Sequence, residues 1–342
     1  MRNSMRGGLT VVAVLLCATW VIAQQNQPPQ GAGGGQAAGQ ATGGQGPAAA
    51  AGQGRAGRGA RTKKVVLAWA DTRNGVAQHD SITHALSQLE RIGYESGTYD
   101  LYIRTDSNIV SFNPKKTDGT PASGGPSLNN VDAILFAGHR NVPLDAAGQA
   151  DLITAIKDQG KGFVALFIGL TPWDTFPEMA NILGAKYVGH SPFGNQPSTL
   201  INESPDFPAT KHIPQVLTTP DPYYQPTDYS RDKMQVLLRL DVSKYAPVPG
   251  YTRTDGDYPV AWAKMYGKGR VFYSSIGNGE TAQWDNNNLL RMYFEAIKWS
   301  LGLTPYEIKP HPLPADARPP QGVPIASPTP PTGRGRAGIP RG

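Results

Sequence analysis

Short apolar runs alternate with segments of helical periodicity along the first half of the foldable part of this chain. The apolar runs have the length of buried strands and lie at residues 65–70, 131–136 and 162–168. The helical segments lie at Ser81–Ile92, from Asp145 to about Asp158, and at Phe176–Leu183. A strand–helix–strand order places successive strands parallel, with the helices packed on the sheet. The sequence therefore predicts an α/β domain with a mostly parallel sheet and helices on both faces.

The second half of the same region is rich in strands instead. Strands are predicted near residues 214–218, 234–240, 258–266 and 270–276. A long helix from Asp285 to Leu301 follows them and ends at Gly302. Strands in close succession are typical of antiparallel pairing. We therefore expect an antiparallel addition to the parallel sheet.

Both flanks of this region have low sequence complexity. Residues 24–62 contain 12 Gly, 10 Ala and 8 Gln, and residues 304–342 are rich in Pro, Gly and Arg. Neither flank has a pattern of apolar residues that could be buried. The sequence predicts a disordered linker at 24–62, one domain at 63–303 and a disordered tail at 304–342.

Residues 1–23 have the features of a secretory signal peptide. Arg2 and Arg6 precede an apolar run from Leu9 to Ala23, which ends in small residues before Gln24. The run is shorter than the roughly 20 residues of a membrane span, so an uncleaved anchor is the weaker alternative. We expect a periplasmic or secreted protein, without stable membrane insertion after the signal is cleaved.

Cysteine usage and charge exclude several classes of function. Cys17 is the only cysteine and lies in the signal, so the mature chain has no disulfide, thiolate nucleophile or Cys-bound metal. The formal net charge of +6 comes from the flanks, which leaves residues 63–303 slightly acidic. We therefore expect no nucleic-acid partner. The oligomeric state stays open.

Polar residues follow the predicted strands at the points where the strands end. They include Asp71, His79, His139, Arg140, Trp173 and Asn278. Ligands of open parallel sheets bind beyond the carboxyl ends of the strands, so these residues are candidates for one cleft. The alternative is that these loops are polar only because they are solvated.

His79 comes directly before the first predicted helix, where Asp80 or Ser81 is the expected N-cap. The positive end of the helix dipole disfavours a charged imidazolium. His79 is therefore expected to be neutral, and able to accept a proton or to bind a metal.

A metal site would require His79, His139, His190 and Asp221 to converge in the fold. The chain has no His-Glu-x-x-His spacing, so we assign no cofactor and keep a divalent metal as a weakly supported alternative. Gly-x-Ser-x-Gly and glycine-rich phosphate loops are also missing, which argues against serine hydrolases and nucleotide-binding enzymes.

Aromatic residues near the predicted loops indicate a sugar ligand. Their rings can pack on the apolar faces of sugars, while Asp, Asn, Arg and His side chains bond the hydroxyls. Trp262 lies inside an apolar strand, so core packing is the alternative for it. The residues assigned to substrate binding are Asp71, His139, Arg140, Trp173, Tyr223, Trp262 and Asn278.

Residues 258–273, with the sequence YPVAWAKMYGKGRVFY, resemble the ThuA-like (trehalose-utilisation type) family. His79-Asp80-Ser81-Ile82, Gly189-His190 and residues 208–212 support the same resemblance, which covers essentially all of 63–303. The resemblance implies a flavodoxin-related, class I glutamine-amidotransferase-like fold. It also implies a link to the catabolism of disaccharides and 3-keto-glycosides.

Four polar positions of the family pattern are altered in this chain. Phe167 stands in place of a histidine, Phe207-Pro208 in place of His-Pro, and Gly277-Asn278 in place of Gly-His. Pro222 replaces the glutamate that commonly follows the aspartate Asp221. His79, His190, Asp221 and Trp262 are retained, and His139 is a candidate to compensate in part.

The leading hypothesis is an exported ThuA-like domain that binds or processes a carbohydrate, such as a 3-keto-glycoside. In an enzyme, His79 or His190 would be the general acid or base, with Asp221 orienting the proton or sharing it. A non-catalytic sugar-binding or scaffold protein is the first alternative, and a metal-assisted hydrolase is the second.

Overall fold

The computed structural model describes residues 63–70, 79–138, 144–171, 176–190, 197–221, 223–246, 253, 255–278, 281–319 and 321–322. The predicted signal (1–23), linker (24–62) and end of the tail (323–342) lie outside these residues, so they stay predictions. None of the helices in the described ranges is long and apolar enough to cross a membrane.

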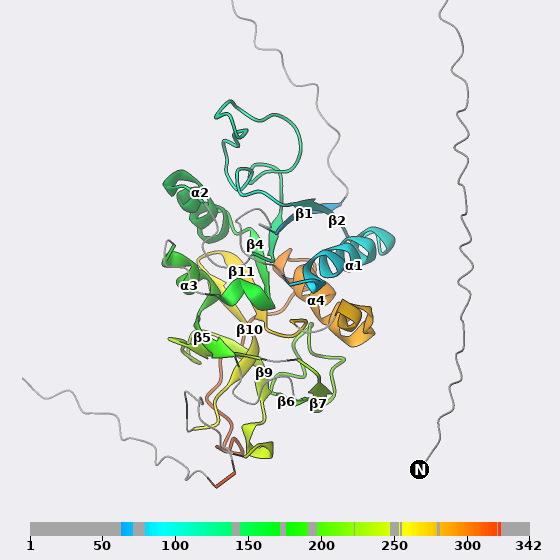
Figure 1. Cartoon of the computed structure of the whole chain (residues 1–342), viewed down its shortest axis with the longest axis vertical. Helices are drawn as coiled ribbons and strands as arrows, with labels where there is room; N and C mark the ends of the chain where they lie inside the picture. Colours follow the sequence, from blue (N-terminus) through cyan, green and yellow to red (C-terminus); the bar gives the residue numbers. More distant parts are fainter. Residues whose placement is uncertain are drawn as a thin grey trace, which may run out of the picture. The chain divides into compact units, whose positions relative to one another are not determined.

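Nine of the described strands form one large sheet with the order β2-β1-β3-β4-β11-β10-β9-β6-β7 (Figure 1). Its parallel part consists of β1 (Lys64–Trp69), β2 (Tyr99–Arg104), β3 (Ala133–Phe136), β4 (Gly162–Leu166) and β11 (Gly269–Ser274). These five strands have the order 2-1-3-4-5 of flavodoxin-like folds. The fold class expected from the sequence is thus confirmed.

The sheet continues with antiparallel strands beyond β11. They are β10 (Pro259–Tyr266), β9 (Gln235–Leu240), β6 (Ser198–Asn202) and β7 (Val216–Thr219). A separate antiparallel pair consists of β5 (Lys186–His190) and β8 (Tyr224–Thr227). The expected antiparallel addition is therefore present and is built mainly from the second half of the chain.

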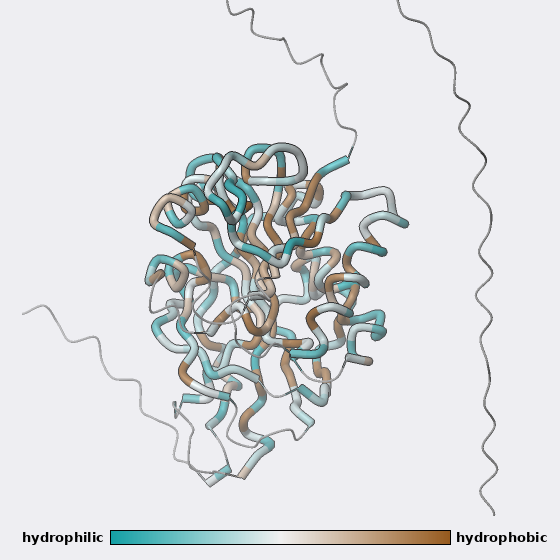
Figure 2. The backbone as a smooth tube through the Cα atoms, turned by 45° about the horizontal axis from the view of Figure 1, so that its top comes forward, coloured by the Kyte–Doolittle hydropathy of each residue, from teal (hydrophilic) through white to brown (hydrophobic). Residues whose placement is uncertain are grey.

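Helices cover both faces of the parallel strands. Residues of α1 (Ser81–Glu95) and α4 (Asn287–Ser300) share one hydrophobic core with one face of the sheet. Residues of α2 (Ala146–Lys157) and α3 (Glu178–Leu183) share a second core with the opposite face. Because both faces are covered, all residues of β3 and β4 are buried, as expected for strands inside an α/β layer structure. Figure 2 shows hydrophobic stretches of the backbone running through the middle of the domain.

The helix ends follow the sequence signals at α2 and α3. Asp145 accepts a hydrogen bond from the Gly148 N–H at 2.7 Å, which caps α2 as predicted. Gly184 ends α3 in a left-handed conformation (φ 90°) that glycine adopts without strain. At α1, in contrast, Asp80 occupies the cap position but makes no side-chain cap hydrogen bond to the described helix.

Several element boundaries differ from the sequence prediction. The strand expected at 162–168 ends at Leu166 because the chain turns into a 3-10 helix at Phe167–Leu170. The long helix expected from Asp285 begins at Asn287, after a 3-10 helix at Thr281–Asp285. The strands β2, β5, β6 and β8 were not expected from the sequence, since they are short and carry many polar residues.

The chain continues to pack against the domain beyond residue 303, where the sequence predicted the start of a disordered tail. Trp299 donates its indole N–H to the Tyr306 carbonyl at 3.1 Å, and the Lys309 N–H donates to Gln235 Oε1 at 2.7 Å. His311 Nε2 lies 3.0 Å from the Val236 carbonyl. The first part of residues 304–342 therefore belongs to the folded unit, because its aromatic and backbone groups find partners on β9 and α4.

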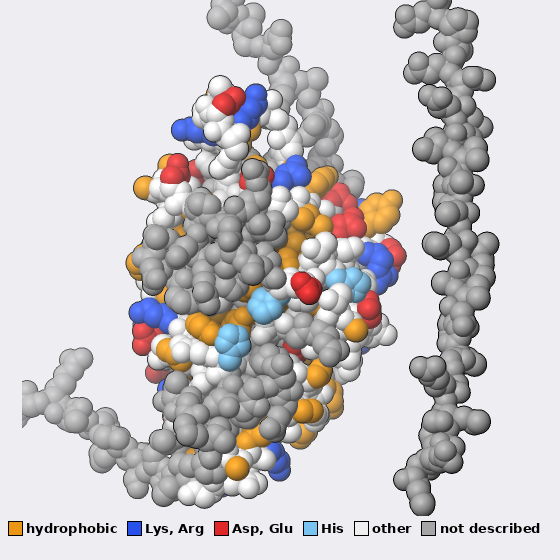
Figure 3. Space-filling view, in the orientation of Figure 1, with side chains coloured by type: hydrophobic (Ala, Val, Ile, Leu, Met, Phe, Trp, Pro, Cys, Tyr) orange, Lys and Arg blue, Asp and Glu red, His pale blue; other side chains and the backbone are white. Residues whose placement is uncertain are grey.

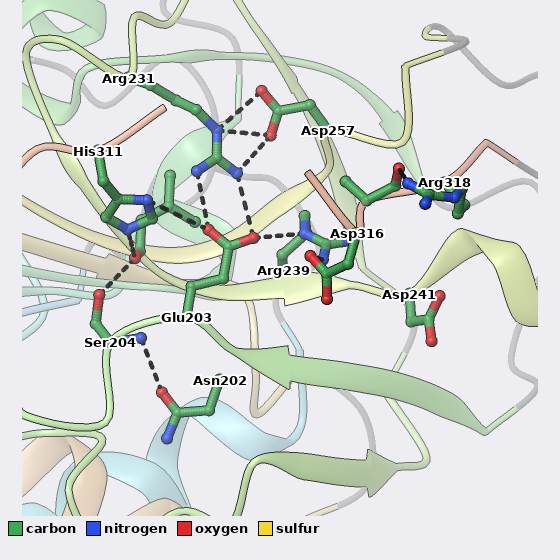
Figure 4. Close-up of polar contacts among 12 residues, drawn as sticks. Asn202, Glu203, Ser204, Arg231, Arg239, Asp241, Asp257, His311, Asp316 and Arg318 are labelled. Carbon is green, nitrogen blue, oxygen red and sulfur yellow. Dashed lines mark hydrogen bonds and ion pairs between the residues drawn. The ribbon is translucent and has the colours of Figure 1, made fainter. Parts of the chain in front are cut away.

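A buried ion network supports this part of the domain (Figure 4). Arg231 donates to Glu203 Oε2 at 2.8 Å and to Asp257 Oδ1 at 2.8 Å. Arg239 donates from Nε to Glu203 Oε1 at 2.5 Å. The Glu203 side chain is only 1% exposed, so its two arginine partners offset the cost of burying its charge.

Candidate functional site

The parallel strands β1, β3, β4 and β11 end at one edge of the sheet, where the sequence predicted a cleft. His79 lies at this edge, immediately before α1, and Phe167 lies there at the end of β4. The His79 ring contacts Phe167 edge to face, with ring centroids 5.4 Å apart and planes at 88°. Phe167 thus forms an apolar wall beside His79.

His190 is the last residue of β5 and is exposed. The Tyr187 hydroxyl lies 2.8 Å from His190 Nδ1, and the Tyr224 ring meets the imidazole edge to face at 5.0 Å. Gln225 donates a hydrogen bond to the His190 carbonyl at 2.8 Å. These contacts fix the orientation of the imidazole from both strands of the β5–β8 pair.

Electrostatics link the two histidines. Burial lowers the pKa of His79 below its ordinary value, and the nearby His190 lowers that pKa further, while Asp80 opposes the shift. This shift favours the neutral form of the His79 imidazole. Figure 3 shows histidine surfaces close together in the middle of one face, next to hydrophobic side chains. His79 and His190 thus lie close enough for their charges to interact, although they are far apart in the sequence.

Asp221 is fully buried. Its Oδ2 accepts hydrogen bonds from the Gly277 N–H at 3.1 Å and from the Thr219 hydroxyl at 3.4 Å. These contacts tie the segment after β7 to the turn after β11. The geometry favours an anchoring role for Asp221.

Tyr223 is buried beside Asp221, with 1% exposure. Its hydroxyl lies 2.5 Å from the Thr219 hydroxyl. Burial, and then the neighbouring Asp221, hold the pKa of Tyr223 well above its ordinary value. The side chain is a neutral phenol within the core.

Trp262 lies in the interior as well. Its indole N–H donates to the Leu183 carbonyl at 2.8 Å, and its ring packs on Tyr273 with centroids 4.4 Å apart. The side chain is 0% exposed. This position favours core packing, the alternative left open by the sequence, over a direct contact with sugar.

Asn278 is buried at the turn that follows β11. The preceding Gly277 has a φ of 99°, and a Cβ atom there would come within 2.6 Å of the Trp284 ring. Trp284 donates its indole N–H to the Gly277 carbonyl at 3.1 Å. The turn therefore requires glycine, and Trp284 and Asp221 hold it from two sides.

The remaining predicted site residues, Asp71, His139, Arg140 and Trp173, lie outside the described residues. Within the described ranges, no group of three or more His, Cys, Asp or Glu side chains is arranged to hold a metal ion. The four-ligand metal site that includes His139 was only an alternative in the sequence analysis, and it stays untested because His139 lies outside the described residues.

Sequence reasoning did not select Tyr187 as a site residue and did not connect Tyr224 with His190. Both tyrosines contact the His190 ring. The two tyrosines come near His190 because residues 186–190 pair with residues 224–227. A single sequence does not reveal the pairing of two such short strands.

Residues 65–300 match the family model described as ThuA, trehalose utilisation. Because this match covers more than half of the chain, the protein belongs to the ThuA family. No curated protein matches the chain.

The solved structures that share this fold include two ThuA-like proteins. A protein from Bacteroides uniformis described as ThuA-like is 18% identical, with a TM-score of 0.55, and the match covers 69% of this chain and 91% of that one. A ThuA-like protein from Parabacteroides merdae is 12% identical, with a TM-score of 0.50 and coverage of 76% and 96%. At these identities the similarity shows the fold alone.

Proposed function

We propose that this protein binds a carbohydrate at the carboxyl edge of its parallel strands and uses His79 and His190 to transfer a proton on it. The observation that carries the proposal is the proximity of these two histidines, one half-buried with a lowered pKa and one exposed. Membership of a family described by trehalose utilisation supports a sugar as the ligand.

The histidine pair suits acid–base chemistry. Two imidazoles that repel each other when both are charged disfavour the state in which both carry a proton. We assign His79, with the lowered pKa, as the base, and His190 as the acid. Such a pair can contribute roughly 10²–10⁴-fold to a rate.

A 3-keto-glycoside is the proposed substrate class. A ketone at C3 makes the neighbouring C2–H acidic, and the neutral His79 imidazole removes that proton. Elimination then forms the C1–C2 double bond and breaks the glycosidic C1–O bond, and His190 gives a proton to the leaving oxygen. The Phe167 wall beside His79 keeps water from the base on one side.

A non-catalytic sugar-binding protein is the second candidate. It is favoured by the position of Asp221, which is buried and bonded to Gly277 rather than exposed beside an open cleft. In that case His79 and His190 form hydrogen bonds with sugar hydroxyls, and no covalent bond of the sugar is broken.

One assay separates the two candidates. Purified protein is incubated with a 3-keto-glycoside, and release of the leaving group is measured for wild type, His79→Ala, His190→Ala and the double variant. Turnover by wild type that falls at least about 100-fold in the double variant supports the catalytic role. Turnover that survives in the double variant refutes the role of the histidines, and saturable binding without turnover supports the second candidate.

We also propose that the protein is exported, on the basis of Arg2, Arg6 and the apolar run up to Ala23. Mass spectrometry of the protein from fractionated cells should then find a chain that begins at Gln24 outside the cytoplasm. A full-length chain in the cytoplasm would refute export.

A further inference from the structure

A cavity of about 180 Å³ lies between α3, the segment that joins β8 to β9, and β10. Asn181 of α3, Lys233 of the joining segment and Lys264 of β10 are among the residues that line it. The volume is below the roughly 300–1,000 Å³ of pockets for drug-sized ligands, so the cavity suits a small ion or one group of a larger molecule. Neither His79 nor His190 lines it, so it is separate from the proposed catalytic pair.

Lys264 brings a largely buried amino group to the cavity wall. The residue is 9% exposed. Its side chain lies against Gly184, where a Cβ atom would come within 2.8 Å of Lys264 Cδ, so this glycine leaves room for the lysine. Lys264 Nζ donates to the Asn181 carbonyl at 2.5 Å and lies 5.8 Å from the centroid of the Tyr266 ring.

The amino group of Lys264 has no carboxylate partner. Within the described residues, no Asp or Glu side chain forms a hydrogen bond or a salt bridge with it. Glu178 is near, but its two oxygens accept hydrogen bonds from the Tyr266 hydroxyl at 2.5 Å and from Asn181 Nδ2 at 2.8 Å. An ammonium group has three N–H donors, and only one of those of Lys264 is used by the protein. A buried charge without a counter-ion is unfavourable, so this position calls for an anion from outside the chain.

Lys233 adds a second positive charge to the same cavity. Burial, and then the charge of Lys233, lower the pKa of Lys264 to about 8, while Glu178 opposes the shift. With that pKa, Lys264 is still mostly charged at pH 7. An anion in the cavity therefore reduces the repulsion between the two lysines.

The acidic residue of the wall does not cancel these charges. Asp228 lines the cavity, but its Oδ2 lies 2.9 Å from Lys186 Nζ, so a third lysine offsets its charge. Ser230 also lines the cavity and has a hydroxyl that can donate to a ligand. The wall therefore has an excess of positive charge and of donors.

We propose that this cavity binds a small oxyanion, such as a phosphate ion or the phosphate group of a small molecule. Lys264 Nζ donates a charge-assisted hydrogen bond to one oxygen of the ligand, and Lys233 attracts the ligand through its charge. The remaining donors of the Lys264 ammonium then have an acceptor.

Calorimetry with inorganic phosphate at pH 8 tests the proposal, with chloride used to keep the ionic strength constant. The variants are Lys264→Met and Lys233→Met, because methionine keeps an unbranched stem without the charge. Lys268→Met is the matched control, since Lys268 is exposed at the β10–β11 turn and does not line the cavity. We expect saturable binding, a Kd at least tenfold higher in Lys264→Met and at least threefold higher in Lys233→Met, and no change in Lys268→Met.

A second measurement needs no substitution. In protein labelled with ¹³C-lysine, phosphate at pH 8 should shift the Cε resonance of Lys264 toward that of the charged amine, and the shift should saturate at the same Kd. The Lys268 resonance should not move. The proposal is overturned if phosphate shows no saturable binding, if Lys264→Met binds it as tightly as wild type, or if the Lys264 resonance does not move.

D-glucose 6-phosphate distinguishes a free ion from a phosphate carried by a larger molecule. Only the binding that Lys264→Met weakens is counted, so that the proposed sugar site does not contribute. A Kd lower than that of phosphate supports a carried phosphate, and an equal or higher Kd supports the free ion. His79 and His190 are unchanged throughout, so failure of this test does not bear on their proposed role.

Discussion

The buried carboxylate of Asp221 accepts a hydrogen bond from the backbone N–H of Gly277 at 3.1 Å. Asp221 follows β7 in the antiparallel part, and Gly277 follows β11 in the parallel part. The contact thus joins the two parts of the sheet at the edge where the candidate site lies. A residue that the sequence assigned to proton transfer has a structural position that favours anchoring.

Replacement of Asp221 should therefore lower stability. Asp221→Ala leaves the buried Gly277 N–H without its acceptor, and we expect the free energy of unfolding to fall by about 1–3 kcal/mol. Asp221→Asn keeps an acceptor oxygen and should lose less. Urea denaturation of the three proteins measures this, and an unchanged midpoint for Asp221→Ala would contradict the anchoring role.

The ion network around Glu203 should be sensitive to loss of one partner. Glu203→Gln leaves Arg231 and Arg239 buried without their shared carboxylate, and should cost about 3–5 kcal/mol of unfolding free energy. Asp206→Asn removes the partner of Lys309 in an exposed pair, and should cost less than about 1 kcal/mol. Urea denaturation of both variants measures the two losses of unfolding free energy. Equal losses would contradict the account, because the buried network would then stabilise the protein no more than an exposed ion pair.

The segment after residue 303 should contribute to stability. A chain truncated after residue 303 loses the hydrogen bonds of Tyr306, Lys309 and His311. Each contributes about 0.5–1.5 kcal/mol, so we expect a loss of about 2–4 kcal/mol and a lower Tm. A chain truncated after residue 322 is the control and should keep the Tm of the full chain. Two identical melting curves would place the boundary of the folded unit at 303 instead.

The lowered pKa of His79 predicts the pH dependence of stability. The neutral form is favoured in the folded state, so the unfolded state binds more protons between the ordinary pKa of about 6.5 and the lower folded value. The contribution of neutral His79 to the free energy of unfolding is therefore fully present above about pH 6.5. It is lost as the pH falls from about 6.5 through the lower pKa of His79 in the folded state. His79→Gln should reduce this slope, measured as unfolding free energy between pH 7.5 and pH 5. A slope as steep as that of wild type would contradict the shift.

Much of the fold follows from short-range signals in the sequence. The apolar run at 162–166 and the Asp145 cap of α2 depend on neighbouring residues, and both were predicted. The partners of short polar strands such as β5 and β8 are set by contacts between distant segments, so the sequence did not reveal them. The boundary at 303 was placed too early because composition alone does not show that Tyr306 packs against Phe207.

The candidate site, like the fold, could be predicted only in part from the sequence. His79 and His190 could be chosen from residue type and position, and the sheet explains why His79 lies at the carboxyl edge. The burial of Asp221 and Trp262 depends on which side of a strand or turn faces the core. Residue type does not determine this, since both aspartate and tryptophan occur in cores and in binding sites.

The central claim is that His79 and His190 form one site, and an NMR titration of the His79 ring tests it most directly. Burial is the main cause of the lowered pKa of His79 and remains in His190→Gln, but the variant removes the added repulsion from His190, so that pKa should rise part of the way toward its ordinary value. Asp80→Asn, which removes the opposing charge, should lower it. A His79 pKa that is the same in wild type and His190→Gln would contradict the account, because the two histidines would then not share a site.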